Sequence, residues 1–516
     1  MSTTSEPVSE ELAPPSDALD RRVMSIATVI VLGAIMSILD ITVVNVAITR
    51  LAADFETPLT TIQWVVTGYT LALATVIPLS AWGVDRFGAK RLYLISIVLF
   101  VAGSALAGMA WNVESLIGFR ILQGLGGGLL MPVGMTILTR AAGPRRLGRV
   151  MAIIGVPMLL GPVLGPILGG WLVDDFSWRW IFFINLPVGI LALVLGIRIL
   201  SPDTERTQRR LDWLGMLLLS PGLALLIYGL AESGSNGGFG HAEVLVPGIA
   251  GALLLLAFGR HALRSADPLI DLRLFRNKLF GVSAGALMLV VIAAFGGMLL
   301  LPLYLQLVRG ETALQTGLLL APQGLGAMIA MPIAGKLADR TGVGRFVPFG
   351  LGAVAVSFWW LTGLEADTSY WALSVALFVM GVGLGFTMMP VMTGAMQTLR
   401  RMDIANASTT INITQQVGAS IGTATLSVIL ANELTSRLGG GEGGGGGGIG
   451  ELATLPPEQF QQIQPLLADA FGTTFVWAVA LVLVAVVVAA VLLPKRKPTP
   501  VMEEDDATPA PPVVLH

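Results

Sequence analysis

The sequence predicts an all-α membrane protein that crosses the bilayer many times. Apolar runs of about 18 residues or more recur along almost the whole chain of 516 residues, and a helix of that length spans the hydrocarbon core of a bilayer. Charged residues make up only 12% of the chain, about half of their usual share in a soluble globular domain. The mean hydropathy of +0.78 agrees with this class.

The apolar runs can be placed one by one along the chain. We expect fourteen transmembrane helices, with boundaries uncertain by a few residues. Their expected positions are residues 24–48, 61–82, 92–111, 115–139, 150–173, 180–200, 212–231, 244–263, 279–307, 313–337, 346–364, 371–397, 406–432 and 472–494.

An internal repeat explains this number. The segment AWGVDRFGAKR (81–91) follows the second span, and GKLADRTG (335–342) follows the tenth. Both place Asp-Arg-x-Gly at the start of a loop on the same side of the membrane. Transporters are often built from two related six-span halves, which would separate the two copies by six spans. Here they lie eight spans apart, so two helices are inserted between the halves, most simply the seventh and eighth.

These positions divide the chain into units. We expect an N-terminal six-helix bundle at residues 21–200, a linker with two inserted helices at 201–265, and a C-terminal six-helix bundle at 266–494. Residues 1–20 and 495–516 are predicted to be disordered cytoplasmic tails. The outer loop 433–471 contains a nearly pure glycine run at 439–450, which predicts a flexible coil. A short helix at 456–470 is predicted to lie on the membrane surface or, less simply, to cover a substrate.

The distribution of Lys and Arg predicts the orientation. With the N-terminus in the cytoplasm, most basic residues fall in cytoplasmic segments, as the positive-inside rule requires. The acidic N-terminus lacks the cationic start of a cleaved signal peptide, so the first span is expected to stay in the membrane. We therefore expect a multi-pass plasma (inner) membrane protein with both termini cytoplasmic and the lipid bilayer as a partner. The predicted outer segments hold only Arg50, Arg179, Arg309 and Arg437.

Two charges lie well inside predicted spans, where charged side chains are costly and point to function. Asp40 lies in LDITVVN of the first span and Arg120 in GFRILQG of the fourth. Counted from the outer ends of their helices, they lie within about one turn of the same depth. Burial favours a protonated carboxyl, whereas a nearby guanidinium favours the carboxylate. Asp40 is therefore a candidate proton carrier tuned by Arg120; the alternative is a fixed contact that only joins two helices.

The stretch GVPMLLGPVLGPILGG (155–170) in the fifth span has unusual spacing. Gly161, Gly165 and Gly169 recur every four residues, which gives a helix one smooth face for close packing. Pro162 and Pro166 each remove a backbone hydrogen bond and bend the helix. Together with Gly170, this pattern indicates a bent, closely packed helix at a moving interface. An ordinary pair of packed helices is the simpler alternative.

The two Asp-Arg-x-Gly copies provide charges at one side of the membrane. Asp85, Arg86, Lys90 and Arg91 belong to the first copy, and Asp339 and Arg340 to the second. Charged pairs of this kind can form when one face of a transporter closes and separate when it opens. They therefore predict a cytoplasmic gate. The alternative is that they only signal topology and form weak surface ion pairs.

Polar, aromatic and methionine side chains within the spans are candidates for the lining of a substrate cavity. Methionine is polarizable and repacks easily, which suits a promiscuous apolar pocket. For any single residue, packing against lipid or core is the simpler explanation. The candidates are Asn45, Gln63, Trp64, Tyr69, Gln123, Phe295, Tyr304, Gln323, Met389 and Gln415.

Several kinds of chemistry are not expected. The chain has no Cys and three His, which argues against disulfides, iron–sulfur clusters, cysteine nucleophiles and a His-ligated metal. It has no phosphate-binding GxxxxGK[ST] loop, so ATP is not expected as the direct energy source. The run QGLGGG (123–128) lies within a span and predicts a packing surface rather than a nucleotide site. No nucleophile–base pair is visible, so we expect no enzyme, no cofactor and no nucleic-acid partner.

Several of these motifs resemble one family. Gly161-xxx-Gly165-Pro166-xx-Gly169-Gly170 resembles the antiporter motif in the fifth span of the major facilitator superfamily. The segments LDITVVNVAI (39–48), FRILQGLGGG (119–128), WRWIFFINLPVG (178–189) and PLIDLRLFRN (268–277) are similar to its fourteen-span drug:proton antiporters, the EmrB/QacA-like multidrug exporters. The first loop motif departs from the family pattern at Ala81, where glycine is usual.

The resemblance implies a function. It implies the major facilitator fold and export of lipophilic, often cationic, small molecules driven by a proton gradient, with Asp40 as the family's acidic residue. Export of a lipid or an endogenous metabolite by the same fold stays open as an alternative. A channel or a membrane sensor is a more distant one.

Overall fold

The computed structural model describes residues 20–143, 146–202, 210–235, 238–396, 398–438 and 457–495, and all regular secondary structure within these ranges is helical. The predicted tails lie outside these residues except for their inner ends at Asp20 and Lys495. The glycine run 439–450 also lies outside them.

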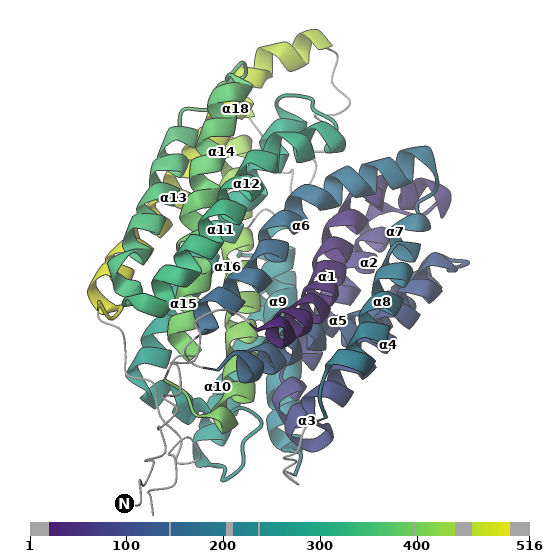
Figure 1. Ribbon diagram of the computed structural model, residues 1–516. Coiled ribbons are helices and arrows are strands. Elements are labelled where there is room, and N and C mark those ends of the chain that lie inside the picture. Colours follow the sequence, from purple (N-terminus) through teal and green to yellow (C-terminus); the bar gives the residue numbers. More distant parts are fainter. Residues whose placement is uncertain are drawn as a thin grey trace, which may run out of the picture.

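The first group of helices lies between Arg21 and Ile199 and occupies the right of Figure 1. Within it α4 packs on α5, α1 on α6 and α2 on α5. Its helices are α1 (Arg21–Asp54), α2 (Leu59–Val76), α3 (Leu79–Phe87), α4 (Ala89–Gly108), α5 (Val113–Ala142), α6 (Leu147–Asp175), α7 (Trp180–Phe183) and α8 (Asn185–Ile199).

The last group of helices forms the second bundle, at the left of Figure 1. Here α11 packs on α16 and α18, and α13 packs on α14 and α18. Its elements are α11 (Lys278–Leu307), α12 (Ala313–Arg340), the 3-10 turn η2 (Val343–Arg345), α13 (Val347–Leu361), α14 (Tyr370–Gly385), α15 (Met388–Met396), the turn η3 (Arg401–Asp403), α16 (Ile404–Leu438) and α18 (Pro457–Leu492).

The two bundles meet along α6 and α12, which face each other between the two groups in Figure 1. Further contacts join α16 to α5 and α3, and α15 to α6. At the α3 end of the molecule the hydroxyls of Ser80 and Thr409 lie 2.6 Å apart. Thr139 donates to the sulfur of Met396 at 3.7 Å. Uncharged side chains therefore join the bundles at this end.

The inserted helices are α9 (Trp213–Ser235) and α10 (Ala242–Arg264), followed by the 3-10 turn η1 (Leu272–Arg276). They approach closely because glycines face each other: a Cβ on Gly251 would lie 2.5 Å from the backbone nitrogen of Leu226. Helix α9 also packs on α2 of the first bundle and α16 of the second. The rings of Trp64 and Tyr228 stack there at 6.0 Å. The inserted pair therefore touches both bundles through one of its helices.

Within the described ranges, eleven helices are long and apolar enough to cross a membrane, or twelve when the bent pair α2–α3 is taken as one span. This pair forms the predicted second span and bends by 56° at a break that contains Pro78, a residue that cannot donate a backbone hydrogen bond. The predicted fifth and eleventh spans correspond to α6 and to the shorter α13. The number of fourteen spans stays a prediction.

The outer segment predicted to form a short helix at 456–470 is helical from Pro457, but it is not a separate element. It forms the first turns of α18, a single helix from Pro457 to Leu492. Phe460 and Ile463 pack against the core of the second bundle, and Gln464 donates to the carbonyl of Val308 at 2.7 Å. Packing on the bundle therefore continues the helix outward.

A carboxylate fixes the inserted pair to the linker that follows it. Asp212 accepts hydrogen bonds from the backbone nitrogens of Gly215 at 2.9 Å and Leu269 at 3.0 Å, and from His261 Nε2 at 2.9 Å. Burial raises the pKa of Asp212, but the hydrogen bonds from Gly215, His261 and Leu269 outweigh it and hold this pKa below its ordinary value of 3.8. Asp212 thus joins the start of α9, the end of α10 and the segment before η1.

We expect Asp212→Ala to destabilise the protein by about 1–3 kcal/mol, because the N–H groups of Gly215 and Leu269 lose their acceptor. The pKa of Asp212 is lower in the folded than in the unfolded protein. Its contribution is therefore complete above the ordinary value of 3.8 and is lost as the pH falls through the folded value. In detergent, the melting temperature of the variant should lie below that of the wild type, and this difference should disappear in acid. The exposed Asp267, replaced by Ala, is the control and should leave the melting temperature unchanged.

Candidate functional site

The structure brings together the two charges predicted inside the spans. Asp40 on α1 and Arg120 on α5 are buried, with 1% and 0% of their surface exposed. Arg120 Nη1 donates to Asp40 Oδ2 at 2.5 Å. The pair lies inside the first bundle, where α1 packs on α5.

Two amide side chains bind the other carboxylate oxygen. Asp40 Oδ1 accepts hydrogen bonds from Gln123 Nε2 at 2.8 Å and from Asn185 Nδ2 at 3.2 Å. Gln123 also accepts from Arg120 Nη1 at 2.7 Å through its own oxygen. Gln123 was a predicted cavity residue, but the structure places it in this buried cluster. We call Asp40, Arg120, Gln123 and Asn185 the Asp40 cluster.

The guanidinium of Arg120 has further contacts. Its Nε donates to the carbonyl of Val65 at 3.2 Å. Its central carbon lies 4.1 Å from the ring centre of Tyr69 and 5.6 Å from that of Phe182, at distances where a cation is attracted to an aromatic face. Tyr69, a second predicted cavity residue, is therefore buried against Arg120 within the first bundle.

These contacts determine what the cluster can do chemically. A buried ion pair is costly unless hydrogen bonds satisfy its remaining atoms. Arginine and amide nitrogens can only donate, so the hydrogen bonds from Arg120, Gln123 and Asn185 suit an ionised Asp40. A proton on Asp40 would remove the charge that binds Arg120. Loss of that charge would weaken the contact between α1 and α5.

Glycines place α5 so that Arg120 reaches Asp40. A Cβ on Gly124 would lie 2.5 Å from the carbonyl of Tyr69 on α2, and one on Gly126 would lie 2.5 Å from the backbone nitrogen of Phe100 on α4. Only glycine permits such close approach. The run 123–128 is therefore a packing surface, as the sequence predicts.

The antiporter motif lies directly beside the helix that carries Asp40. A Cβ on Gly161 would overlap Ile38, and one on Gly165 would overlap Thr42; on Gly169 it would lie 3.1 Å from the carbonyl of Val43. Thr42 also donates to the carbonyl of Gly161 at 3.3 Å. The glycine face of α6 thus packs on α1 on both sides of Asp40. Gly170 points elsewhere, toward Leu314 of α12, and Pro166 lies within α6.

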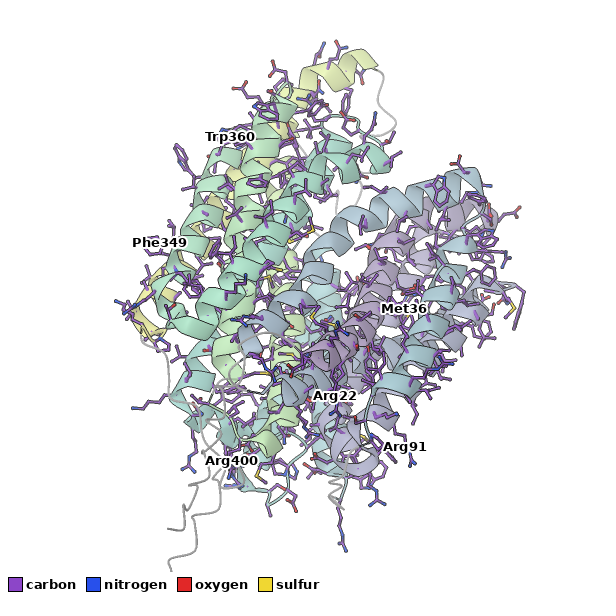
Figure 2. The ribbon with its side chains drawn as sticks, in the orientation of Figure 1. Arg22, Met36, Arg91, Phe349, Trp360 and Arg400 are labelled. Carbon is purple, nitrogen blue, oxygen red and sulfur yellow. The ribbon has the colours of Figure 1, made fainter. Side chains whose placement is uncertain are left out.

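The predicted gate residues lie at the α3 end of the molecule. Arg86 and Arg91 are exposed there, and Figure 2 shows Arg91 near the lower end of the first bundle. Lys90 donates to the carbonyl of Ile197 at 2.8 Å and to that of Leu200, so it caps the C-terminal end of α8. Asp85 is half-buried. Asp339 and Arg340 end α12, and their side chains lie outside the described part. Pairing between the two copies stays a prediction.

The remaining cavity candidates occupy separate environments. Asn45 and Gln63 are exposed, and Trp64 stacks on Tyr228 of α9. Tyr304 donates to the carbonyl of Glu365 at 2.5 Å and packs within the second bundle rather than between the bundles. Met389 adjoins Gly155 of α6, and Gln415 donates to the sulfur of Met392 at 3.7 Å. Gln323 is buried, and Phe295 packs against the core.

Two residues of the site were not identified from the sequence. Asn185 and Ser104 are uncharged, so the cost of a charge in lipid does not reveal them. Asn185 lies in FFINLPVG, and an amide among apolar residues was the one feature of the sequence that could have identified it. No metal-binding group of three or more His, Cys, Asp or Glu side chains is found among the described residues.

Comparison with known proteins identifies the family. The family model described as Major Facilitator Superfamily matches residues 30–423. The chain belongs to the Major Facilitator Superfamily. This confirms the resemblance of the sequence motifs, and the arrangement of two helical bundles is the major facilitator fold.

Relatives within the superfamily cover most of the chain. The Multidrug resistance protein B homolog of Mycobacterium tuberculosis is 43% identical over 500 residues, which is 93% of this chain and 92% of that protein. The Multidrug export protein EmrB of Escherichia coli is 31% identical over 424 residues, 81% of this chain and 82% of that protein.

A solved structure of the superfamily shows the same fold. The human organic anion transporter MFSD10 matches with a TM-score of 0.61 at 14% identity, covering 91% of this chain and 100% of that one. At this identity the likeness concerns the fold alone. Membership of this transporter superfamily makes the chain a multi-pass membrane protein.

We expect Gly165→Ala to weaken the α1–α6 contact, because the added methyl group overlaps Thr42. Overpacking of this kind costs about 1–3 kcal/mol and should lower the melting temperature in detergent. Gly170→Ala is the matched control, since its Cβ would lie 4.0 Å from the nearest atom, on Leu314. Equal melting temperatures for the two variants would contradict the packing assigned to Gly165.

Proposed function

We propose that this chain is a proton-coupled exporter that expels lipophilic, often cationic, small molecules by alternating access. The observation that supports it most is the Asp40 cluster: a buried carboxylate, held by hydrogen-bond donors, on a helix packed against the glycine face of α6. The names of the relatives, multidrug resistance and multidrug export proteins, support the substrate class.

The proposed coupling begins with the protonation of Asp40. The neutral carboxyl binds the Arg120 guanidinium less strongly, so the contact between α1 and α5 weakens. Helix α1 also packs on α6, and α6 packs on α12 of the other bundle. A shift of α1 is thereby transmitted to the interface between the bundles. Coupling of two sites requires such an element with two arrangements that both sites bias.

The proposed energy source is the proton gradient, with neither ATP nor a cofactor, and no catalytic reaction is proposed. Protons and small lipophilic molecules are the proposed ligands. The substrate would enter a cavity between the bundles, near Met389 and Gln415 on the side of the second bundle. Asp85, Arg86, Lys90, Arg91, Asp339 and Arg340 would form the gate at the α3 end.

We further propose the plasma membrane as the location, with both termini cytoplasmic. The positive-inside rule supports this orientation. Arg22, Arg91 and Arg400, which come from distant parts of the sequence, all lie toward the lower end in Figure 2. The α3 end would then face the cytoplasm.

Transport in proteoliposomes tests the proposal. With an imposed pH gradient and a lipophilic cationic dye such as ethidium, the wild-type protein should move the dye against its gradient, and a protonophore should abolish this movement. Asp40→Asn should lower this transport at least about 100-fold, in line with the loss of a group needed for proton transfer, while the protein still folds. Glu114→Gln, an exposed acid on α5, is the control and should transport normally.

Two results would contradict the proposal. Full transport by Asp40→Asn would exclude Asp40 as the proton-coupling residue. Failure of the wild-type protein to move dyes under a pH gradient, together with movement of labelled phospholipid, would instead identify a lipid exporter.

A further inference from the structure

We infer that Asn185, held in place by Ser104, is a positioning residue that sets the pH at which Asp40 binds its proton. This inference rests on the proposed function, in which Asp40 exchanges a proton. It assigns a role to two uncharged side chains on α8 and α4 that do not belong to the Asp–Arg pair.

The hydrogen bonds of Ser104 determine whether Asn185 faces Asp40 with its amide nitrogen or with its oxygen. The hydroxyl of Ser104 donates its one hydrogen to the carbonyl of Phe182 at 2.9 Å. Toward Asn185 the same oxygen can therefore only accept, and it does so from Asn185 Nδ2 at 3.1 Å. The second hydrogen of that amide nitrogen goes to Asp40 Oδ1 at 3.2 Å. The Asn185 side chain thus presents a donor, and not its oxygen, to the carboxylate.

A fixed donor stabilises the ionised form of the carboxyl that it faces. Asn185 and Ser104 are both buried, with 4% and 0% exposed, so bulk water does not replace the donor. Asp40 Oδ1 accepts hydrogen bonds from two amides, those of Gln123 and Asn185. Loss of one of these two donors should therefore change the proton affinity of Asp40.

Other titratable groups near Asp40 are few. Arg120 faces it from α5, and Tyr69 lies close by from α2. The helices α6, α7 and α8, which also pack on α1, carry no titratable side chain at residues 150–173, 180–183 and 185–197. A shift caused by substitution of Asn185 is therefore not a shift of a neighbouring acid.

Infrared titration of the purified full-length protein tests the inference without a transport assay. The carbonyl band of protonated Asp40 is identified by its absence from Asp40→Asn, and its midpoint is then measured against pH. Removal of a donor favours the protonated form, so Asn185→Leu should move the midpoint up by about one pH unit, a tenfold change in proton affinity. Ser104→Ala should move it in the same direction by less, because the amide loses its anchor.

Ser96→Ala is the matched control. Ser96 lies on the same helix as Ser104 and is equally buried, but its hydroxyl donates to the carbonyl of Leu92 in its own helix. Its variant should titrate like the wild type. If Asn185→Leu fails to fold, Ser104→Ala tests the inference instead. This substitution removes a single oxygen atom and is therefore less disruptive to packing.

Wild-type midpoints for both Asn185→Leu and Ser104→Ala would overturn the inference, as would the absence of an Asp40 band from every variant over the titrated range. The outcome is distinct from that of the transport assay. A shifted band together with normal transport by Asp40→Asn would retain the positioning role and reject Asp40 as the coupling residue.

Discussion

The interaction on which the rest depends is the buried hydrogen-bonded pair of Asp40 and Arg120. Two charges in a low-dielectric interior are costly unless donors and acceptors surround them. Here the partners come from α1, α2, α5 and α8, and Arg120 Nη2 is the one nitrogen of this guanidinium that is buried without a hydrogen-bond partner among the described residues. The need to satisfy this pair therefore determines how four helices of the first bundle are packed. Gly124 of α5 permits the close approach of α2, and the glycines of α6 permit that of α6 to α1.

Helix α6 connects this buried pair to the second bundle, because it packs on α1 with one face and on α12 with another. One face packs on α1, whose Ile38 and Thr42 side chains occupy the space beside Gly161 and Gly165, and another meets α12 of the second bundle. Glycines at four-residue spacing let α6 pack tightly on α1, because they leave room for side chains of the neighbouring helix. The position of this smooth face beside Asp40 joins the acid to the interface between the bundles.

The residues of the site that could be predicted from the sequence are those whose burial in a membrane is most costly. Asp40 and Arg120 were identifiable because charges are rare in lipid, and the glycine spacing in α6 shows on any helical projection. Asn185 and Ser104 were missed because burial of an uncharged polar residue costs less than burial of a charge, so such residues are more common in spans. Tyr69 and Gln123 were assigned to a cavity because spacing alone does not say whether a side chain faces its own bundle or the other one. The continuation of α18 depends on tertiary packing of Phe460 and Ile463, which a local pattern does not contain.

The inserted helices have a mechanical consequence. Helix α9 contacts α2 of one bundle and α16 of the other, while Asp212 anchors the pair to the segment that leads into α11. If the two bundles rotate relative to each other, a helix pair that touches both can keep its contacts with only one of them. Because of this anchor we expect the pair to move with the second bundle, so that relative movement occurs at the contact with α2, where Trp64 stacks on Tyr228.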